Sequence, residues 1–333
     1  MIEVRKPGLS TTVQDAGRTG YYDLGIPPSG ALDQYSLRAA NLLVGNAEDD
    51  AVLECVYMGP ELVFTEAAVV AVTGAVMVPK VNGEERPQWE SFAVDAGDVL
   101  SFAYLAGGAR AYLAVAGGVD VPVVLGSRST YGLGALGGFS GRPLAAGDVL
   151  PVGSGSGSAG RSVPADLRTS YSKDVEVRVM MGLYDHRLSA GGRATFLDTT
   201  WKLTPVADRI GFRYSGAELE TVDREPPFGA GQDPSNIVDA PYPIGSIQVP
   251  GSVEPIVLHR DAVSGGGYMM VATVLSGDLD VVAQSAPGTR TRFVEVDLDG
   301  ALALRAERRA RDGRLREALG RPPIRGACGR ARP

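Results

Sequence analysis

The fold is decided by residues 61–116, which read ELVFTEAAVVAVTGAVMVPKVNGEERPQWESFAVDAGDVLSFAYLAGGARAYLAVA. Short runs rich in β-branched residues alternate here with Gly, Pro, Asn and Asp, a pattern typical of short strands joined by tight turns. Asn82-Gly83 is the clearest hairpin turn, because this pair adopts positive φ angles at the lowest cost. The strands expected from this stretch are Glu61–Phe64, Ala68–Thr73, Val76–Val81, Ser91–Val94, Val99–Leu105 and Ala109–Ala116.

The composition extends this β-rich prediction to the whole chain. With 333 residues, the chain is long enough for two domains of roughly 150 residues each. Its 44% hydrophobic and 21% charged residues are ordinary for a globular protein. Its 44 Gly and 22 Pro favour many turns over long helices. We therefore predict a mainly β fold with a minor α component.

Two helices and a repeated turn are expected among the strands. Apolar residues at helical spacing predict one helix from Ser29 or Asp33 to Leu43 and another from Ala301 to about Leu319. The sequence Ala-Gly-Asp-Val-Leu occurs at 96–100 and 146–150, where we expect two similar turns that each start a strand. The strands expected in the second half are Val175–Met181, Phe196–Leu203, Ile237–Val238, Ser246–Val249, Ile256–His259, Met269–Leu275, Val281–Ala283 and Arg292–Val296.

Domain boundaries follow from one Gly- and Ser-rich segment. Residues 153–160 form the best linker in the chain, since none of their side chains can anchor them. The expected organisation is a first β domain at 1–152, a linker at 153–172, a second β domain at 173–298 and an Arg-rich, helical or disordered tail at 299–333. Residues 222–236 form an expected loop of a length at which loops tend to be functional or disordered.

The charge distribution argues against nucleic acid as a partner. Residues 301–333 carry ten Arg against three acidic residues, so the other 300 residues hold a net charge of −14 within the overall −7. That excess of acidic residues is unsuited to a phosphate backbone. The tail is expected to be a solvated, partly disordered terminus without a function of its own.

Several mechanisms are excluded by the residues that are scarce. Two cysteines, Cys55 and Cys328, and two histidines, His186 and His259, leave neither a disulfide framework nor a metal cluster. Four lysines without a phosphate-binding loop exclude a P-loop nucleotide site, and no serine-hydrolase elbow with a histidine partner is present. No segment has the pattern of a signal peptide or a membrane span, so a cytoplasmic location is expected.

Two polar segments of the first half are candidates for ligand binding. In the first, Gln14 and Arg18 could hold a planar carboxylate or ureido group, although an Asp15–Arg18 pair that caps a turn explains the same residues. In the second, a buried strand runs into Ser127, Arg128, Ser129 and Thr130, and Arg142 could add a second guanidinium for an anion. An ordinary polar turn is the alternative for this second segment.

The second half offers another group. Arg209 and Arg213, at odd positions of one expected strand, would point to the same face. Gln248 stands inside an apolar strand, so its amide is either a structural bridge or a ligand contact. His259 is expected to be a surface or satisfied histidine, so catalysis would have to run without histidine.

These segments resemble the biotin-dependent carboxyltransferase family once called allophanate hydrolase subunit 2, which includes the 5-oxoprolinase C-subunit and KipA-like proteins. The resemblance runs from about Val4 to Val296. Its motifs are Thr12-Val13-Gln14-Asp15-x-Gly-Arg18, Gly30-x-x-Asp33, Asn41-x-x-x-Gly45-Asn46, Leu53-Glu54, Thr73-Gly74-Ala75, Tyr112-Leu113-Ala114-x-x-Gly117-Gly118, Leu125-Gly126-Ser127-Arg128-Ser129-Thr130, Gly141-Arg142-x-Leu144, Asp208-Arg209-x-Gly211-x-Arg213, Ile247-Gln248-Val249-Pro250, Pro255-Ile256, Asp261 and Gly266-Gly267-Tyr268.

The resemblance implies two cyclophilin-like β-barrel domains with a cleft between them, and a companion of the KipI or allophanate hydrolase subunit 1 type. It also allows a third, LamB/YcsF-type subunit. The implied activity is that of a subunit of an ATP-dependent, 5-oxoprolinase-type complex that opens a cyclic amide. One alternative is a carboxyltransferase that acts on a urea-like acceptor with carboxybiotin on a separate carrier, since this chain has no Met-Lys-Met biotinylation sequence. A KipA-like regulator that binds a kinase inhibitor is the other.

Within the implied cleft, we expect specific roles for these residues. Arg128 and Arg142 hold an anionic or ureido oxygen through forked hydrogen bonds, and Gln248 orients a planar amide. Asp261 accepts or shuttles a proton while Arg209 balances its charge. The alternative for this pair is an ion pair that fastens the second barrel. The remaining expected substrate-binding residues are Gln14, Arg18, Ser127, Ser129, Thr130, Arg213 and Tyr268.

Overall fold

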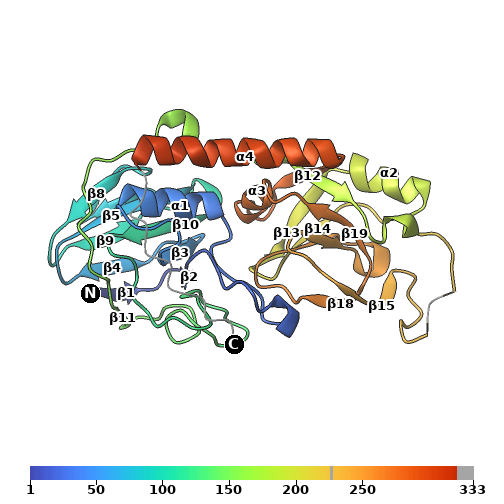
Figure 1. Cartoon of the computed structure of the whole chain (residues 1–333), viewed down its shortest axis with the longest axis horizontal. Helices are drawn as coiled ribbons and strands as arrows, with labels where there is room; N and C mark the ends of the chain where they lie inside the picture. The colour runs from blue at the N-terminus through green and yellow to red at the C-terminus, as the bar shows by residue number, and fades with distance from the viewer. Residues whose placement is uncertain (226–227, 321–333) are drawn as a thin grey trace. The chain divides into compact units, whose positions relative to one another are not determined.

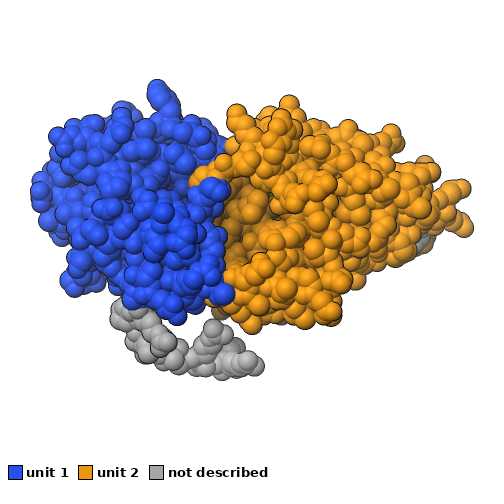
Figure 2. All heavy atoms as spheres, turned by 90° about the horizontal axis from the view of Figure 1, so that it is seen from above, with its two compact units in different colours: residues 1–17, 34–170, 310–333 blue, residues 18–33, 171–309 orange. Residues whose placement is uncertain are grey.

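The computed structural model describes residues 1–225 and 228–320 (Figure 1). The chain forms two compact units, coloured blue and orange in Figure 2. Unit 1 comprises residues 1–17, 34–170 and those from 310 onward, and unit 2 comprises residues 18–33 and 171–309. The main border therefore falls at the end of the expected linker, but residues 18–33 cross into unit 2, which no change in composition announces.

Unit 1 consists of two β-sheets that share one hydrophobic core. Six strands in the order β11-β1-β4-β9-β6-β7 form one sheet, and five in the order β2-β3-β10-β5-β8 form the other, within the described residues. The strands are β1 (Ile2–Lys6), β2 (Ser10–Gln14), β3 (Val52–Val56), β4 (Glu61–Phe64), β5 (Ala68–Val76), β6 (Pro79–Val81), β7 (Glu84–Glu85), β8 (Ser91–Val94), β9 (Val99–Phe102), β10 (Gly107–Val115) and β11 (Val149–Leu150). Helix α1 (Gln34–Leu43) packs along β5 and β10, and the Thr73 hydroxyl donates to the Ser36 carbonyl at 2.7 Å.

The expected turns of unit 1 are confirmed. Asn82 (φ 52°) and Gly83 (φ 89°) join β6 to β7 as a tight hairpin. At each Ala-Gly-Asp-Val-Leu site, the Asp carboxylate accepts from the N–H three residues earlier, Asp98 from Asp95 at 2.8 Å and Asp148 from Ala145 at 2.7 Å. The two turns lead into β9 and β11, so the repeated sequence builds the same device twice.

Unit 2 contains a closed barrel. Within the described residues it has the strand order β12-β19-β16-β17-β14-β13-β20, and a parallel pairing of β12 with β20 closes it. Its strands are β12 (Asp174–Met181), β13 (Trp201–Ala207), β14 (Gly211–Ser215), β16 (Ser246–Gln248), β17 (Ile256–Leu258), β19 (Met270–Val274) and β20 (Arg290–Glu295). A separate two-stranded sheet pairs β15 (Asn236–Pro241) with β18 (Gly265–Tyr268). The chain is thus mainly β, as the sequence predicts, although unit 1 is built as two sheets and unit 2 as a closed barrel.

Of the expected strands, Val281–Ala283 is helical, and Phe196–Leu203 is helical at its start and joins strand β13 only from Trp201 onward. Residues 196–198 end helix α2 (Ala190–Asp198), which begins after Ser189, whose hydroxyl accepts from the Gly192 N–H. Residues 281–283 belong to helix α3 (Leu279–Ala283). Periodicity cannot separate a short buried helix from a short buried strand, and the cap at Ser189 was not recognised. The remaining helical turns are η1 (Tyr22–Leu24), η2 (Ala165–Leu167), η3 (Asp185–Arg187) and η4 (Pro250–Ser252).

The Gly- and Ser-rich segment packs closely against unit 1 rather than hanging free. The Gly153 N–H donates to the Gly118 carbonyl at 3.0 Å, and a Cβ at Gly155 would lie 2.3 Å from the backbone nitrogen of Gly117. The glycines therefore allow a backbone-to-backbone approach that any side chain would prevent.

The start of the Arg-rich tail is an ordered helix, α4 (Leu298–Leu319) (Figure 1). Arg311 lies 3.6 Å from the ring centroid of Tyr35 and donates to the Leu167 carbonyl, and Arg316 pairs with Glu48 at 2.6 Å. These arginines therefore fasten the helix and are not solvated charge. The rest of the tail, with Cys328, lies outside the described residues. Within the described part of the chain, no helix is both long and apolar enough to cross a bilayer.

Candidate functional site

Asp15 brings two of the predicted segments together in unit 1. Its carboxylate accepts from the Ser127 hydroxyl at 2.7 Å, from the Arg128 N–H at 2.6 Å and from the Ser129 hydroxyl. The Gly17 N–H donates to it as well, at 2.8 Å. Asp15 therefore caps the loop at 127–129, which replaces the Asp15–Arg18 pair considered from the sequence. Both serine hydroxyls therefore donate their hydrogen bonds to this carboxylate.

Gln14 and Thr130 fix the same loop to strand β2. The Gln14 amide donates to the Thr130 carbonyl at 3.1 Å and to the Thr12 hydroxyl at 3.0 Å. Thr130 in turn donates its N–H and its hydroxyl to the Val13 carbonyl. Gln14 and Thr130 are buried. Both residues thus position the loop rather than face a solvent-filled site.

Arg128 and Arg142 each have a carboxylate partner. Arg128 binds Asp120 at 2.8 Å and the Val121 carbonyl at 2.8 Å. Arg142 binds both oxygens of Asp148 at 2.8 Å, a hydrogen-bonded contact that raises the pKa of Arg142 and lowers that of Asp148. Their forked hydrogen bonds therefore already serve protein groups, and an anion would have to displace or share them.

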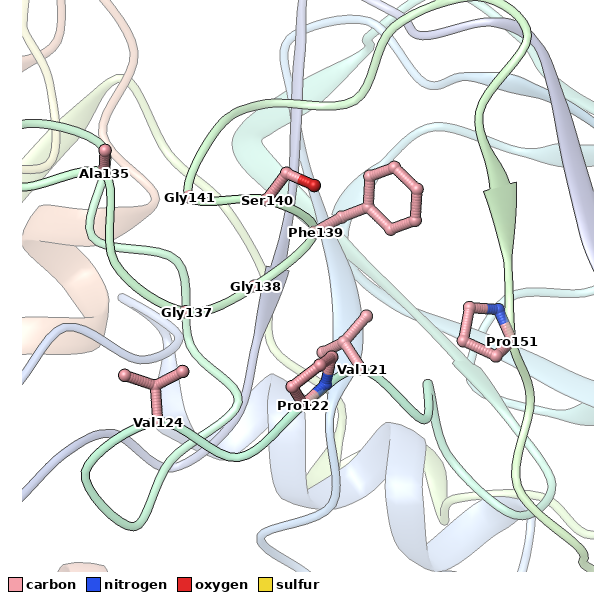
Figure 3. Close-up of a pocket in the computed structure, with 10 residues that line it drawn as sticks. All are labelled: Val121, Pro122, Val124, Ala135, Gly137, Gly138, Phe139, Ser140, Gly141 and Pro151. Carbon is pink, nitrogen blue, oxygen red and sulfur yellow. The ribbon is translucent and has the colours of Figure 1, made fainter.

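Two hollows lie in this part of unit 1. A polar hollow of about 220 Å³ is lined by Arg128, Asp50, Asp120 and the glycines at 117, 118 and 153. A more apolar hollow of about 430 Å³ lies between the segments 121–124 and 135–141. Figure 3 shows Phe139 and Pro151 on one side of this second hollow and Val124 on another. Unit 1 therefore offers a charged recess at Arg128 and a more apolar recess between the segments 121–124 and 135–141.

In unit 2, Arg209 and Asp261 form a forked ion pair. The Arg209 Nε and Nη2 atoms bind the two Asp261 oxygens at 2.8 and 3.1 Å, and Nη2 also donates to the Gly30 carbonyl at 2.7 Å. The Arg260 Nε donates to the Ser29 carbonyl at 2.5 Å. Two arginines thus hold the left-handed turn at Ser29 (φ 52°) and Gly30 (φ 85°).

The turn at Ser29 and Gly30 leads to Asp33, which is held inside the same unit. The Asp33 carboxylate accepts from the Gln284 amide at 2.8 Å, and both residues are buried. Arg18, at the other end of the segment that crosses into unit 2, is also buried, and its N–H donates to the Pro28 carbonyl at 2.6 Å. The Gly30-x-x-Asp33 motif is therefore anchored to the barrel by side chains of three separate segments.

The prediction that Arg209 and Arg213 share one strand is wrong. Strand β13 ends at Ala207 and β14 begins at Gly211, so Arg209 lies in the turn between them. The Asp208 carboxylate stabilises this turn by accepting hydrogen bonds from the N–H groups of Ile210 and Gly211. Arg213 instead pairs with Glu254 at 2.7 Å.

Gln248 lies in the same row of the barrel as Arg213. Ile256 is in register with both, with Gln248 on one neighbouring strand and Arg213 on the other. Paired residues point to one face of a sheet, and the flanking Ile247 and Val249 are buried in the core. The half-buried Gln248 amide makes no hydrogen bond to any described residue, so the structure gives it no bridging partner and leaves it available for a ligand.

Tyr268 stands at the end of the two-stranded sheet. Its N–H donates to the Tyr242 hydroxyl at 2.8 Å, and that hydroxyl donates to the Tyr268 carbonyl at 2.6 Å. Burial raises the pKa of Tyr242. Tyr268 as a whole is 43% exposed. The backbone of Tyr268 is thus fixed while its phenol remains accessible.

A buried polar row was missed in the sequence. Glu54 is in register with Thr12 on one side and Tyr112 on the other, and the Tyr112 hydroxyl donates to Glu54 at 2.9 Å. Arg110 lies 4.0 Å from the same carboxylate. Glu54 and Arg110 interrupt otherwise apolar strands, which is the signal that could have revealed them. Their neighbour Cys55 faces the core, and burial raises the pKa of its thiol to about 12.

Within the described residues, no three His, Cys, Asp or Glu side chains are grouped so that they could hold a metal ion. The two clusters therefore offer hydrogen bonds, ion pairs and one accessible amide as their chemistry. Asp261 is an oriented carboxylate, and Gln248 is a donor and acceptor on one rigid strand.

Comparison with known proteins places the chain. The sequence profile described as carboxyltransferase domain, subdomain A and B, matches residues 24–295. The chain belongs to this carboxyltransferase-domain family. It is 34% identical to the 5-oxoprolinase C-subunit of Escherichia coli over 310 residues, which cover 92% of this chain and 95% of that protein.

Other members of the carboxyltransferase-domain family are much longer. The chain is 35% identical to urea amidolyase of Saccharomyces cerevisiae over 314 residues, 91% of this chain but 17% of that protein. The crystal structure of urea amidolyase from K. lactis superposes with a TM-score of 0.89 at 35% identity, covering 95% of this chain and 20% of that one. The chain therefore spans about a fifth of the length of the urea amidolyases it matches.

Proposed function

We propose that this carboxyltransferase-family chain is a subunit of an ATP-dependent complex that opens a cyclic amide of the 5-oxoproline type. The observation that carries the proposal is the extent of the match. Two 5-oxoprolinase C-subunits, from Escherichia coli and Haemophilus influenzae, are covered over 95% and 94% of their own lengths. Nearly every region of those proteins thus has a counterpart here, whereas most of a urea amidolyase lies outside the match.

The residues of unit 2 supply the chemistry of this proposal. A cyclic amide offers one N–H and one carbonyl oxygen, and the Gln248 side chain can pair with both. Asp261, oriented by two hydrogen bonds from Arg209, accepts a proton from the attacking water and returns it to the ring nitrogen. Hydrolysis adds the water oxygen to the carbonyl carbon and transfers a proton to the ring nitrogen as the C–N bond breaks. Tyr268 and Arg213 complete the proposed surface.

The described clusters do not fit the triphosphate of ATP. Arg128, Arg142, Arg209 and Arg213 each have a carboxylate partner. Lys6 and Lys80 are likewise paired with Glu61 and Glu85. Phosphate sites need uncompensated cations or a cradle of N–H groups. We therefore place ATP on a companion of the KipI or allophanate hydrolase subunit 1 type, with a LamB/YcsF-type third subunit as a further partner.

An assay of the assembled complex tests the proposal. The chain is co-expressed with its companions, and glutamate formation from 5-oxoproline is measured with and without ATP. We expect turnover that requires ATP and every subunit. Formation of glutamate by the chain alone, or failure of the chain to associate with a companion, would contradict the proposal.

A carboxyltransferase acting on a urea-like acceptor is the second candidate, because the matching family is named for that reaction. Biotin would then be carried by a separate protein. The discriminating arm of the assay supplies urea and a carboxylated biotin carrier in place of 5-oxoproline and ATP. Carboxyl transfer in this arm, with no glutamate in the other, would favour the second candidate. A complex that binds its companion but is inactive in both arms would indicate a regulator.

A further inference from the structure

Arg187 and Arg224 meet in unit 2, and Arg224 lies near the start of the loop expected at 222–236. Arg187, at the end of η3, donates to the Asn236 carbonyl at 3.2 Å. Arg224 donates to the same carbonyl at 2.6 Å and to the Pro234 carbonyl at 3.3 Å. Because both side chains bind one oxygen atom, their guanidinium groups are immediate neighbours.

Within the described residues, neither guanidinium forms an ion pair with a carboxylate. The nearby carboxylate of Asp185 is bound to Arg193 at 2.8 Å, and Arg193 also binds Glu295. Burial and, next, the neighbouring charge of Arg224 lower the pKa of Arg187. This pair contrasts with Arg128, Arg142, Arg209 and Arg213, each of which is paired with a carboxylate.

The pair also retains unused donors. A guanidinium carries five N–H groups. The hydrogen bonds to Asn236 use Nη1 of Arg187 and Nη2 of Arg224, while the buried Nε of Arg224 has no hydrogen-bond partner among the described residues. Leaving a buried donor of a charged group unsatisfied is costly. The Tyr184 ring, 4.8 Å from the Arg187 guanidinium carbon, holds that group in a fixed orientation.

We propose that Arg187 and Arg224 form a binding site for a small oxyanion, a carboxylate or a phosphate, which no role discussed above assigns to them. The anion supplies the missing negative charge and accepts hydrogen bonds from the two forks, the geometry in which arginine binds planar carboxylates and phosphates best. The proposal does not depend on the reaction proposed for the chain, because the hydrogen bonds of the pair go to Pro234 and Asn236 and not to Asp261, Arg209 or Gln248.

A structural clamp is the competing explanation. In that case the two arginines serve only to hold the backbone at Pro234 and Asn236. A clamp predicts that substitutions lower the stability of the protein equally with or without an anion. An anion site predicts that stabilisation by the anion itself is lost.

The test uses the full chain, with inorganic phosphate and with glutamate as probes. Binding is measured by calorimetry and by thermal melting against sodium chloride at equal ionic strength. We expect saturable binding of at least one probe and a matching rise in Tm. Binding of phosphate alone or of glutamate alone identifies the class of anion; binding of neither overturns the proposal.

Variants separate the two explanations. We expect Arg187→Gln and Arg224→Gln to weaken the binding of the probe at least tenfold, and Arg187→Lys, which keeps the charge but loses the fork, to weaken it less. The matched control is Arg290→Gln, an exposed arginine of the same unit that pairs with Asp174 at 2.5 Å. If Arg224→Gln does not fold, Arg187→Lys still reports on the fork. Unchanged affinity in the folded Arg187 variants, or an equal loss in the control, would overturn the proposal.

Discussion

Asp15 accepts hydrogen bonds from Ser127, Arg128 and Ser129, residues more than 110 positions away in the sequence. We expect Asp15→Asn to destabilise the chain by about 2–3 kcal/mol, because the new amide turns one acceptor into a donor that faces other donors in a buried site. Urea unfolding followed by circular dichroism measures the loss. Proteolysis within residues 125–142 should become faster.

The control for Asp15 is Asp120→Asn in the same region. Asp120 also binds Arg128, but its side chain is 55% exposed. Exposed ion pairs contribute about 0–1 kcal/mol. A loss of stability in Asp120→Asn as large as that in Asp15→Asn would show that the loop depends on charge in general and not on the acceptor at Asp15.

A substitution of Gln248 is expected to lower turnover while leaving the stability of the chain almost unchanged. Because its amide makes no hydrogen bond to a described residue, we expect Gln248→Leu to change the free energy of unfolding by less than about 0.5 kcal/mol. Turnover of the complex should fall at least tenfold if Gln248 orients the substrate amide. Steady-state kinetics and thermal melting provide the two readouts.

Gln88 serves as the opposite case. Its amide donates to the Ala75 carbonyl at 2.9 Å. Gln88→Leu should therefore cost about 1 kcal/mol of stability and leave turnover unchanged. Normal turnover in a folded Gln248→Leu complex would remove Gln248 from the proposed site.

For single residues, the sequence indicates which polar residues belong to the candidate clusters better than it indicates their hydrogen-bond and ion-pair partners. It singled out Gln14 and the Ser127–Thr130 loop as two separate candidate segments, and the structure joins them through the Thr130 carbonyl. It could not show that Asp120 and Asp148 neutralise Arg128 and Arg142, because such pairings depend on loop geometry. Arg209 was misplaced because the turn at Asp208 has no glycine until position 211.

The two Ala-Gly-Asp-Val-Leu turns can be compared directly, because the Asp148 carboxylate binds Arg142 whereas the Asp98 carboxylate binds Asn82. Hydrogen bonds, from Arg142 first for Asp148 and from Asp95 first for Asp98, lower the pKa of both carboxylates. A lowered pKa gives a stabilising contribution that is present above the unfolded value, near 3.9, and lost as the pH falls through the folded value. The advantage of the wild type over Asp148→Asn should therefore be largest at neutral pH and disappear in acid.

Comparison of the two turns isolates the contribution of the Arg142 guanidinium to stability. The bond to Arg142 makes the stability difference of Asp148→Asn depend on Arg142, so Arg142→Gln should shrink it and leave the difference of Asp98→Asn intact. Urea unfolding between pH 2.5 and 7 measures both. A difference for Asp148→Asn that stays constant across this range would contradict the assigned cause.

The packed glycine segment gives another element-scale prediction. A Cβ at Gly155 would lie 2.3 Å from a backbone nitrogen, which cannot move as a flexible side chain can. We expect Gly155→Ala to destabilise unit 1 by about 1–3 kcal/mol, as overpacking does. Ser156→Ala, one residue along, is the control and should be nearly neutral. Equal melting temperatures for the two variants would mean that the segment is a free linker after all.

Strands were easier to predict than short helices for a physical reason. Turn residues precede the run at 61–64, as Gly59-Pro60, and follow the run at 91–94, as Asp95-Ala96-Gly97, and the structure places β4 and β8 at these positions. Residues 281–283 have a similar apolar run, but the carbonyl of Asp278 accepts from Val281 and Val282 and folds them into α3. The choice between the two depends on tertiary contacts that the sequence does not display.

The pairing of charges limits the chemistry that the chain can perform without a companion. Its candidate clusters contain arginines that are balanced by carboxylates, and its two histidines leave little general-base chemistry near neutral pH. Amide hydrolysis coupled to ATP therefore needs groups that the described clusters lack.

We expect the isolated chain to be folded but inactive, and the companion subunits to restore turnover of 5-oxoproline in proportion to the complex formed. Analytical ultracentrifugation at increasing companion concentration gives the fraction of assembled chain, and glutamate release gives the activity of the same samples. The two curves should coincide, because we propose that ATP binds to the companion, whereas the oriented Asp261 belongs to this chain. Asp261→Asn complexes that assemble normally should lose at least tenfold in turnover. Activity that saturates before assembly does, or full turnover by the Asp261→Asn complex, would place the reacting groups on the companion instead.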